Sequence, residues 1–557
     1  MQVSRKLSRM KRASLFLFIL LFTLAGAAQH EHHGDDVAWV PREVLERPVP
    51  LRDGIGNLHE KVTTESQPAQ AFYDQGLNYL HSYVWIEAAR SFKQALREDA
   101  TLIMAWVNLS RVYANMDDLV AAAAAQYEAQ KLAKKNRATD AQKMRIKIQG
   151  AWLTALSEPS NEKKERAYKK LLDQALAGRP KDIELMLLRG NSEEAHIAGR
   201  GQRGGKPSME WYHKVLAVEK ENAAAHHYLI HSNELIGDIP QALVHGEIYA
   251  RLAAEVPHAQ HMYAHDLRRT GRIDEAIERF QRAKDLEDAY YAAEKIDRSL
   301  DWHHSHNLNL LATAYQYRGE MKTAERLMKE AQSMKVISDY QAFFHKEYPE
   351  FLLGRGRVNE ALAAAQEMAG STWPMARAAG HALAGSAHLQ LNDAESAQAM
   401  LRKAEAELAG LREKGRFGPA AMFPGPYVDA LKAELMLRSG KRAEAGELLK
   451  NAIQRIRAVP GPDAWTQALF RMEYMGKIAR QYGDWKLAAH IAQQMLDHDA
   501  HYGGTHYALA LVAEHDGERA KAREHLQQAQ KYWAKADSDL AEVVDLKSKL
   551  GTETAWR

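Results

Sequence analysis

Residues 69–102 read AQAFYDQGLNYLHSYVWIEAARSFKQALREDATL, and the same spacing of large and small side chains returns in residues 103–136. Large residues at helical spacing fill the groove of a partner helix, and small residues let two helix backbones approach closely. The pattern therefore predicts a pair of packed helices that repeats. The residues that carry it are Phe72, Gly76, Tyr79, Ala88, Phe92 and Ala95 in the first unit, and Trp106, Leu109, Tyr113, Ala122 and Ala129 in the second.

A second signal extends the repeat through the rest of the chain: a turn residue followed five positions later by Ala. Gly is the usual turn residue, because it adopts the left-handed backbone that ends a helix without strain. Asn392, followed by Ala397, is the same device, since Asn also tolerates that backbone. The glycine pairs are Gly237/Ala242, Gly271/Ala276, Gly319/Ala324, Gly356/Ala361, Gly440/Ala445, Gly483/Ala488 and Gly517/Ala522.

With these residues the chain resembles the tetratricopeptide repeat family over about residues 69–540. The resemblance implies an all-α fold, a right-handed α-solenoid of about ten helix-turn-helix repeats. It also implies a concave face, lined by the first helix of each pair, on which positions 2, 5, 9, 12 and 13 contact ligands. The expected parts are N-terminal repeats 69–220, degenerate near 140–220 and holding one repeat or two; central His-rich repeats 221–335; C-terminal repeats 336–540; and a C-terminal tail, 541–557.

A narrower resemblance concerns two short stretches. Residues 76–83, GLNYLHSY, are similar to the Leu-His-Ser-aromatic opening of a group of mostly bacterial, exported tetratricopeptide proteins. The same group tends to carry His-Tyr-x-x-His, which stands here at residues 227–231. The activity of that group is unsettled, so this resemblance supports the fold and adds little about function.

Composition excludes several classes of function. The 75 Lys and Arg residues exceed the 72 Asp and Glu residues by three, and five of the positive charges fall in the first 28 residues. Without that segment the chain would carry about −2, so no nucleic-acid partner is expected. The absence of Cys from the sequence excludes disulfides, thiolate metal sites and cysteine nucleophiles.

The N-terminus predicts export. Residues 1–28 combine a basic stretch, a short apolar run and small residues, as a secretory signal peptide does; the alternative is an uncleaved anchor. Residues 29–68 are expected to be a poorly ordered lead-in containing His and Pro. No later segment is apolar enough to span a bilayer, so the mature protein is expected in the periplasm or outside the cell. Cleavage after Ala27 would place His30 third in the chain, where the N-terminus could bind copper or nickel.

Histidines gather in the centre of the chain, with ten of the 26 lying between His226 and His306. Six of them occupy positions 2, 5 and 9 of three successive repeats, on the predicted concave face. Imidazoles there could bind Zn, Cu, Ni or Fe, contact a peptide, or be structural only. Glu193, Glu194 and Glu234 are candidate ligands or supporting carboxylates. The six histidines are His227, His231, His258, His261, His265 and His306.

No stretch matches a catalytic motif in its required context. Residues 199–204, GRGQRG, match a dinucleotide-binding pattern but follow a helix instead of a strand, so they are interpreted as a flexible basic loop. His303 and His304 are expected in a loop between repeats. The sequence favours an exported scaffold that binds a protein or peptide through its concave face. A metal-binding protein or metal-dependent enzyme is the competing hypothesis, and a structural spacer is the third.

Overall fold

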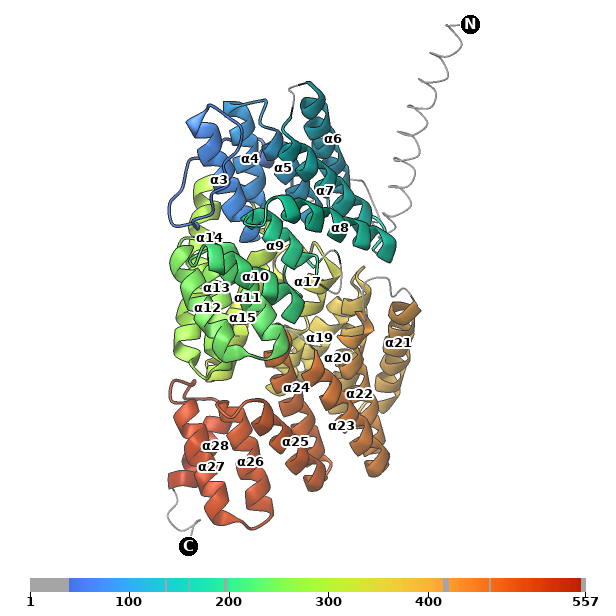
Figure 1. Cartoon of the computed structure of the whole chain (residues 1–557). Helices are drawn as coiled ribbons and strands as arrows, with labels where there is room; N and C mark the ends of the chain where they lie inside the picture. The colour runs from blue at the N-terminus through green and yellow to red at the C-terminus, as the bar shows by residue number, and fades with distance from the viewer. Residues whose placement is uncertain are drawn as a thin grey trace, which may run out of the picture. The chain divides into compact units, whose positions relative to one another are not determined.

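The structure is a computed structural model. It describes residues 40–135, 138–159, 161–194, 197, 199–413, 420–459 and 462–551. All regular structure in these residues is helical and none is strand, which confirms the all-α solenoid prediction (Figure 1). The signal peptide 1–28 and His30 lie outside the described residues. The chain divides into unit 1, residues 1–232, and unit 2, residues 233–557.

Unit 1 stacks helix pairs in chain order. The pairs α3/α4, α5/α6, α7/α8 and α9/α10 each pack as a hairpin, and α4 packs on α5 and α8 on α9. The degenerate stretch therefore contains two pairs, α7/α8 and α9/α10. The helices are α2 (Arg42–Leu45), α3 (Gln67–His81), α4 (Trp85–Glu98), α5 (Ile103–Asn115), α6 (Leu119–Lys135), α7 (Asp140–Leu156), α8 (Glu162–Gly178), α9 (Ile183–Asn191), α10 (Lys206–Val218) and α11 (Ala223–Ile236), whose last turn belongs to unit 2.

Unit 2 continues the same arrangement. Hairpins α13/α14, α15/α16, α18/α19, α20/α21, α22/α23, α24/α25 and α26/α27 follow one another, with two short 3₁₀ turns at Arg298–Leu300 and Ala420–Met422. The helices are α12 (Ile239–Leu252), α13 (Pro257–Arg269), α14 (Ile273–Glu294), α15 (Trp302–Arg318), α16 (Met321–Gln332), α17 (Asp339–Phe344), α18 (Glu347–Gly354), α19 (Val358–Ala369), α20 (Pro374–Gln390), α21 (Ala394–Glu413), α22 (Gly425–Arg438), α23 (Arg442–Ala458), α24 (Pro462–Gln481), α25 (Trp485–His498), α26 (Gly503–His515), α27 (Arg519–Tyr532) and α28 (Ala541–Gly551).

The turn residues behave as the repeat pattern predicts. All seven predicted glycines have a positive φ, and so does Asn392, at +63°. The alanines that follow them are buried, so each small side chain lies where two helices meet. The first two repeats lack a turn Gly, and there Tyr83 and Asp117 adopt the left-handed backbone, with φ of +58° and +61°. This turn therefore recurs even where the residue type gives no signal for it.

The lead-in is packed from residue 40 onward, where a poorly ordered segment was expected. Leu58 donates its backbone N–H to Asn78 Oδ1 at 2.9 Å, and its carbonyl accepts from Asn78 Nδ2 at 3.1 Å. Gln75 Oε1 accepts from the backbone N–H of Arg52 in the same way. Polar side chains of α3 satisfy the backbone of this segment, so it needs no regular structure to be ordered. Its apolar side chains Val40, Val44, Leu45, Val49, Ile55, Leu58 and Val62 are buried.

The end of the chain was expected to be a tail, but residues 541–551 form α28. Its Val543 and Leu546 pack with Leu526 and Trp533. Arg355 also forms a two-bonded ion pair with Glu542, at 2.8 Å for each bond. Two apolar side chains one turn apart give this short helix a buried face, which is what holds it on the last repeat.

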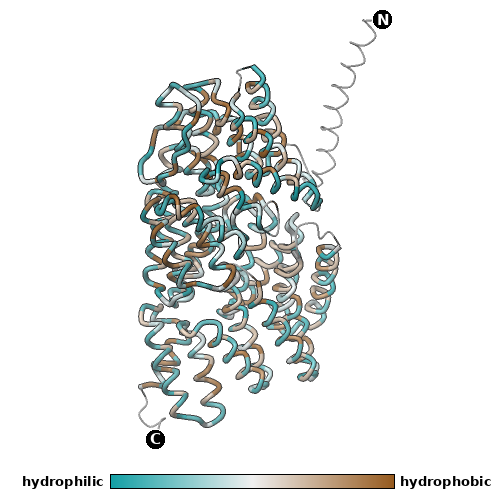
Figure 2. Tube along the Cα trace, viewed as in Figure 1, coloured by the Kyte–Doolittle hydropathy of each residue, from teal (hydrophilic) through white to brown (hydrophobic). Residues whose placement is uncertain are grey.

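Apolar and polar stretches alternate along the helices (Figure 2). This distribution fits helices that bury one face and expose the other. Within the described part of the chain, every helix is too short or too polar to cross a bilayer.

One buried carboxyl group leads to a prediction about how the stability of the protein depends on pH. Burial raises the pKa of Glu434, on α22, to about 8, although the guanidinium of Arg471 opposes the shift. At pH 7 the folded protein keeps this proton and the unfolded chain has lost it, so stability declines as pH rises from about 4.5 to about 8. Glu434→Gln should therefore raise the free energy of unfolding by about 4 kcal/mol at pH 8 and change it little at pH 4.5.

Urea unfolding at both pH values measures this effect. Glu278→Gln, which changes an exposed carboxyl group on α14, is the matched control and should show no such pH dependence. An equal effect of Glu434→Gln at pH 4.5 and pH 8 would contradict the shifted pKa.

Candidate functional site

A pocket opens on the first helices of the successive pairs in unit 1. The volume of the pocket, including the part open to solvent, is about 460 Å³. Helices α3, α5, α7, α9 and α11 supply most of its lining, and α8 adds Tyr168, so the pocket lies mainly on the face that the repeat resemblance assigns to ligand binding. The lining residues are Leu80, His81, Tyr83, Arg111, Asn115, Trp152, Tyr168, Asn191, Ser192, Ile197, Arg200 and Tyr228.

The two short motifs of the sequence meet at this pocket. His81 contacts the Tyr228 hydroxyl through Nδ1 at 2.7 Å and Glu184 Oε1 through Nε2 at 2.8 Å. The backbone carbonyl of His81 also accepts a hydrogen bond from His227 Nδ1 at 2.6 Å. The Leu-His-Ser-Tyr opening and the His-Tyr-x-x-His run therefore form one polar network.

A buried network of charged side chains contacts His81 through Glu184. Arg145 Nη1 contacts Glu60 Oε1 at 2.7 Å, and Nη2 lies 3.7 Å from Glu184 Oε2. Burial favours the neutral form of Glu184, but His81 and Arg145 outweigh it and hold the pKa of that carboxyl below 4.5. Burial dominates at Glu60 and raises its pKa. The carboxylate of Glu184 therefore faces His81 and orients its ring.

Two guanidinium groups lie at the pocket. Arg111 sits 4.3 Å above the Trp152 ring and donates to the Tyr168 hydroxyl at 3.3 Å. Arg200 sits 4.8 Å above the Trp85 ring. Stacking on aromatic rings holds each guanidinium in place. Arg200 also donates from Nη2 to Asp117 Oδ1 at 2.9 Å, so only its other N–H groups are left for an anion.

The glycine-rich loop positions Arg200. Arg200 has a φ of +63°, and its carbonyl accepts from the Tyr83 hydroxyl at 2.7 Å. At Gly201, with φ of +96°, an added Cβ would lie 2.5 Å from the Tyr228 ring. A side chain at residue 201 would collide with the Tyr228 ring, so this loop packs closely against the pocket wall. A flexible loop was expected here.

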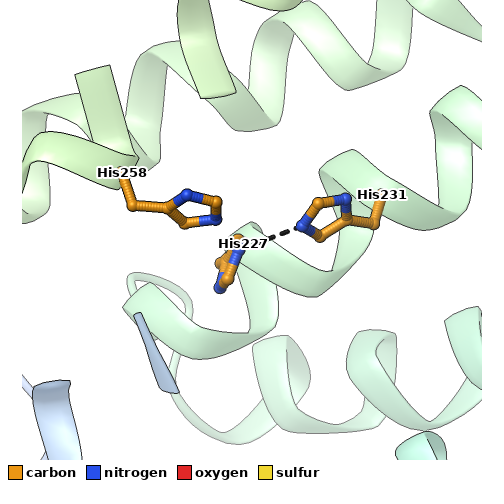
Figure 3. Close-up of side chains that lie close together, drawn as sticks. All are labelled: His227, His231 and His258. Carbon is orange, nitrogen blue, oxygen red and sulfur yellow. Dashed lines mark hydrogen bonds between the residues drawn. The ribbon is translucent and has the colours of Figure 1, made fainter. Parts of the chain in front are cut away.

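The predicted histidines fall into two groups. In unit 1, His227 and His231 face each other from successive turns of α11, with their Nε2 atoms 3.2 Å apart (Figure 3). In unit 2, His261 and His265 repeat this arrangement one repeat later on α13, with their Nε2 atoms 2.8 Å apart. Burial, together with His265 and other neighbouring histidines, lowers the pKa of His261 well below 6.5, so its ring is neutral at pH 7.

The unit 2 group is larger than the sequence pattern predicted. The His306 ring centre lies 4.8 Å from that of His261. His303, expected in a loop, lies in α15, and its ring centre is 4.6 Å from that of His261. Asp301 accepts from the His303 backbone N–H and caps α15 at Trp302, so His303 and His306 share one helical face. His258 also belongs here, 4.9 Å from His303 between ring centres.

The three predicted carboxylates have different surroundings. Glu234 Oε1 lies 3.4 Å from His265 Nδ1. Glu193 pairs instead with Lys169 and Arg189 in unit 1. Burial raises the pKa of Glu194 to about 8, although hydrogen bonds from the backbone N–H groups of Arg203 and Gly201 oppose this shift. Glu234 is therefore placed beside a histidine pair, whereas Glu194 is a neutral acid at pH 7.

Comparison with known proteins identifies the repeat at two places. The tetratricopeptide repeat model matches residues 257–282 and 503–528, which begin with α13 and α26. No curated protein sequence matches the chain.

Several solved structures are similar over much of the chain. The human IFIT1 dimer with PPP-AAAA is 13% identical, with a TM-score of 0.34, and the match covers 85% of this chain and 92% of that one. The APC/C hetero-tetramer Cut9-Hcn1 is 12% identical, with a TM-score of 0.30, over 86% of this chain and 96% of that one. YrrB, a TPR protein with an unusual peptide-binding site, is 17% identical, with a TM-score of 0.25, over 36% of this chain and 93% of that one.

Proposed function

We propose that this protein is an exported tetratricopeptide scaffold that binds a peptide segment of a partner protein in the pocket of unit 1. The observation that carries the proposal is the pair of stacked guanidinium groups, Arg111 and Arg200, in a pocket walled by aromatic rings on the first helices of successive repeats. Export rests on the signal-peptide pattern of residues 1–28.

The chemistry of the pocket selects a carboxylate. Arg111 supplies charged N–H donors, and Arg200 adds those that Asp117 does not use. Asn115 and Asn191 add amide groups. Arginine binds carboxylates through two parallel hydrogen bonds, which fixes orientation as well as charge. Trp152 and Tyr168, which are 4% and 1% exposed, form the buried wall against which Arg111 lies. A peptide with a free C-terminal carboxylate or an acidic side chain fits these features.

The pocket is a better candidate binding surface for a peptide than the central histidines are. His227, His258, His261 and His265 are all buried, with at most 3% of each residue exposed. Their rings contact other side chains of this chain, so they offer little surface to an incoming peptide. This burial supports a proposed binding surface on unit 1 instead of on the histidines.

Peptide capture tests this function. The mature protein is exposed to a peptide library displayed with free carboxyl termini and to the same library with amidated termini. Binding should favour the free carboxylates, and Arg111→Met should weaken it by about 10–100-fold, because it leaves a buried carboxylate without its charged partner.

Arg402→Met, which removes an exposed arginine on α21, is the matched control and should leave binding unchanged. Equal capture by the Arg111→Met variant and the unaltered protein would overturn the assignment of this pocket. N-terminal sequencing of the protein purified from its natural host tests export, because a mature chain that begins after residue 27 or 28 is expected.

A further inference from the structure

Histidines from two helices of unit 2 converge on one point that the proposed peptide pocket does not use. We propose that His261, His265 and His306 bind a divalent transition-metal ion. One ligand nitrogen from each ring lies within 4.8 Å of the other two. The three residues come from α13 and α15, which belong to successive repeats, so the site is built by the stacking of two helix pairs.

The hydrogen bonds of His261 direct a lone pair to this point. His261 Nδ1 lies 2.8 Å from Asn307 Oδ1. The Asn307 amide is oriented by its own donation from Nδ2 to the Phe280 carbonyl at 3.1 Å, so the atom that faces His261 is the oxygen. An oxygen of this kind only accepts, and His261 must therefore carry its proton on Nδ1. The lone pair of the neutral ring is then on Nε2, which faces His265.

His265 is arranged in a similar way. Its Nδ1 lies 3.4 Å from Glu234 Oε1, and its Nε2 lies 2.8 Å from His261 Nε2. With the proton of His261 on Nδ1, its Nε2 accepts a hydrogen bond from His265 Nε2. A metal ion bound here would take the place of this shared proton, and His265 would then carry its proton on Nδ1, beside the Glu234 carboxylate. Carboxylates and amides that hold the far nitrogen of a ring are the usual support of a metal-binding histidine.

The spacing is close to that of a bound ion. Metal–nitrogen bonds of about 2.0–2.1 Å place two ligand nitrogens of one tetrahedral ion about 3.3 Å apart. The observed separations run from 2.8 Å to at most 4.8 Å, so ring movements of about 1 Å would complete the site. Imidazole nitrogens favour zinc, copper, nickel, cobalt or iron over calcium and magnesium.

His303 is the candidate fourth ligand. Its Nδ1 lies 2.5 Å from Glu287 Oε1, which again leaves Nε2 for an ion. That Nε2 is buried and has no hydrogen-bond partner among the described residues. The ring centre of His303 lies 4.6 Å from that of His261 and 6.2 Å from that of His306. The ligand nitrogens that lie close to one another are those of His261, His265 and His306, so the His303 ring would have to move to supply a fourth.

Binding of Zn²⁺ and Co²⁺ to the untagged mature protein tests the proposal. Both ions are titrated by calorimetry, bound metal is measured after dialysis, and Co²⁺ is followed by its visible absorption. These probes also avoid the N-terminal amine site, which suits copper and nickel. The unaltered protein should bind one equivalent that His306→Ala loses, with affinity reduced at least 100-fold.

Asn307→Leu separates a metal site from a merely structural cluster, because it removes no ligand. It should weaken Zn²⁺ binding about 10–100-fold. His388→Ala, which removes a histidine of α20, is the matched control and should bind as the unaltered protein does.

Folding of each variant is checked by circular dichroism, and His306 is the preferred site of change because it is only half-buried. The same Zn²⁺ stoichiometry in the unaltered protein and in His306→Ala would overturn the proposal, as would no binding in either. Arg111→Met should bind Zn²⁺ normally, so failure of the peptide pocket and failure of the metal site are distinguishable.

Discussion

Replacing Arg145 with Met should lower the free energy of unfolding by about 3–5 kcal/mol at pH 7. Arg145 is only 4% exposed and lies between the carboxyl groups of Glu60 and Glu184. Removing it leaves buried negative charge without its cation, and that charge cannot regain water while the protein stays folded. Urea unfolding followed by circular dichroism measures the change.

An exposed ion pair provides the control for this prediction. Arg166 pairs with Glu162 on α8, and both side chains are more than half exposed. Arg166→Met should change the free energy of unfolding by less than about 1 kcal/mol, because water screens such pairs. Equal small effects of the two substitutions would show that the buried network contributes little. Arg145→Met should also weaken peptide binding, since His81 in the pocket rests on Glu184.

Replacing Gly380 with Ala should lower the free energy of unfolding by about 3 kcal/mol. Gly380 lies where α20 crosses the end of α19. An added Cβ would lie 2.5 Å from the backbone nitrogen of Ala369 and 2.9 Å from the carbonyl oxygen of Ala365. Backbone atoms within a helix cannot rotate away as a side chain can, so the two helices would have to separate.

Gly446→Ala is the matched control, and its effect should have the opposite sign. Gly446 is inside α23, and an added Cβ there would meet nothing within 4 Å. Ala is favoured over Gly in a helix interior by about 0.5–1 kcal/mol, so this variant should be more stable than the unaltered protein. Thermal and urea unfolding of both variants test the pair; stabilisation by Gly380→Ala would contradict the close helix contact.

Much of the fold was predictable because repeat signals are local. Turn residues such as Gly319 and Asn392 set the left-handed turn within one helix pair, and small residues such as Ala324 lie at its closest approach. These requirements do not depend on distant parts of the chain. Tyr83 and Asp117 make the same turn with residue types that do not predict it.

The candidate sites were predictable only in part. Helical spacing alone places His261 beside His265, because residues four apart lie on one face of a helix. It did not place His303, which lies in the first turn of a helix that Asp301 caps. Asp301, followed by Trp-His-His-Ser-His, is the helix-start signal that would have found it.

Helical period, turn residues and small contact residues act within one helix pair, so they are enough to identify this chain as a stack of helix pairs. Which side chains from different pairs share a site depends on tertiary packing. His81 contacts Tyr228, which lies 147 residues away in the sequence, and His261 contacts Asn307, which lies 46 residues away. These long-range contacts depend on the rotation between successive helix pairs. That rotation results from many packing contacts together, so no repeating sequence pattern predicts it.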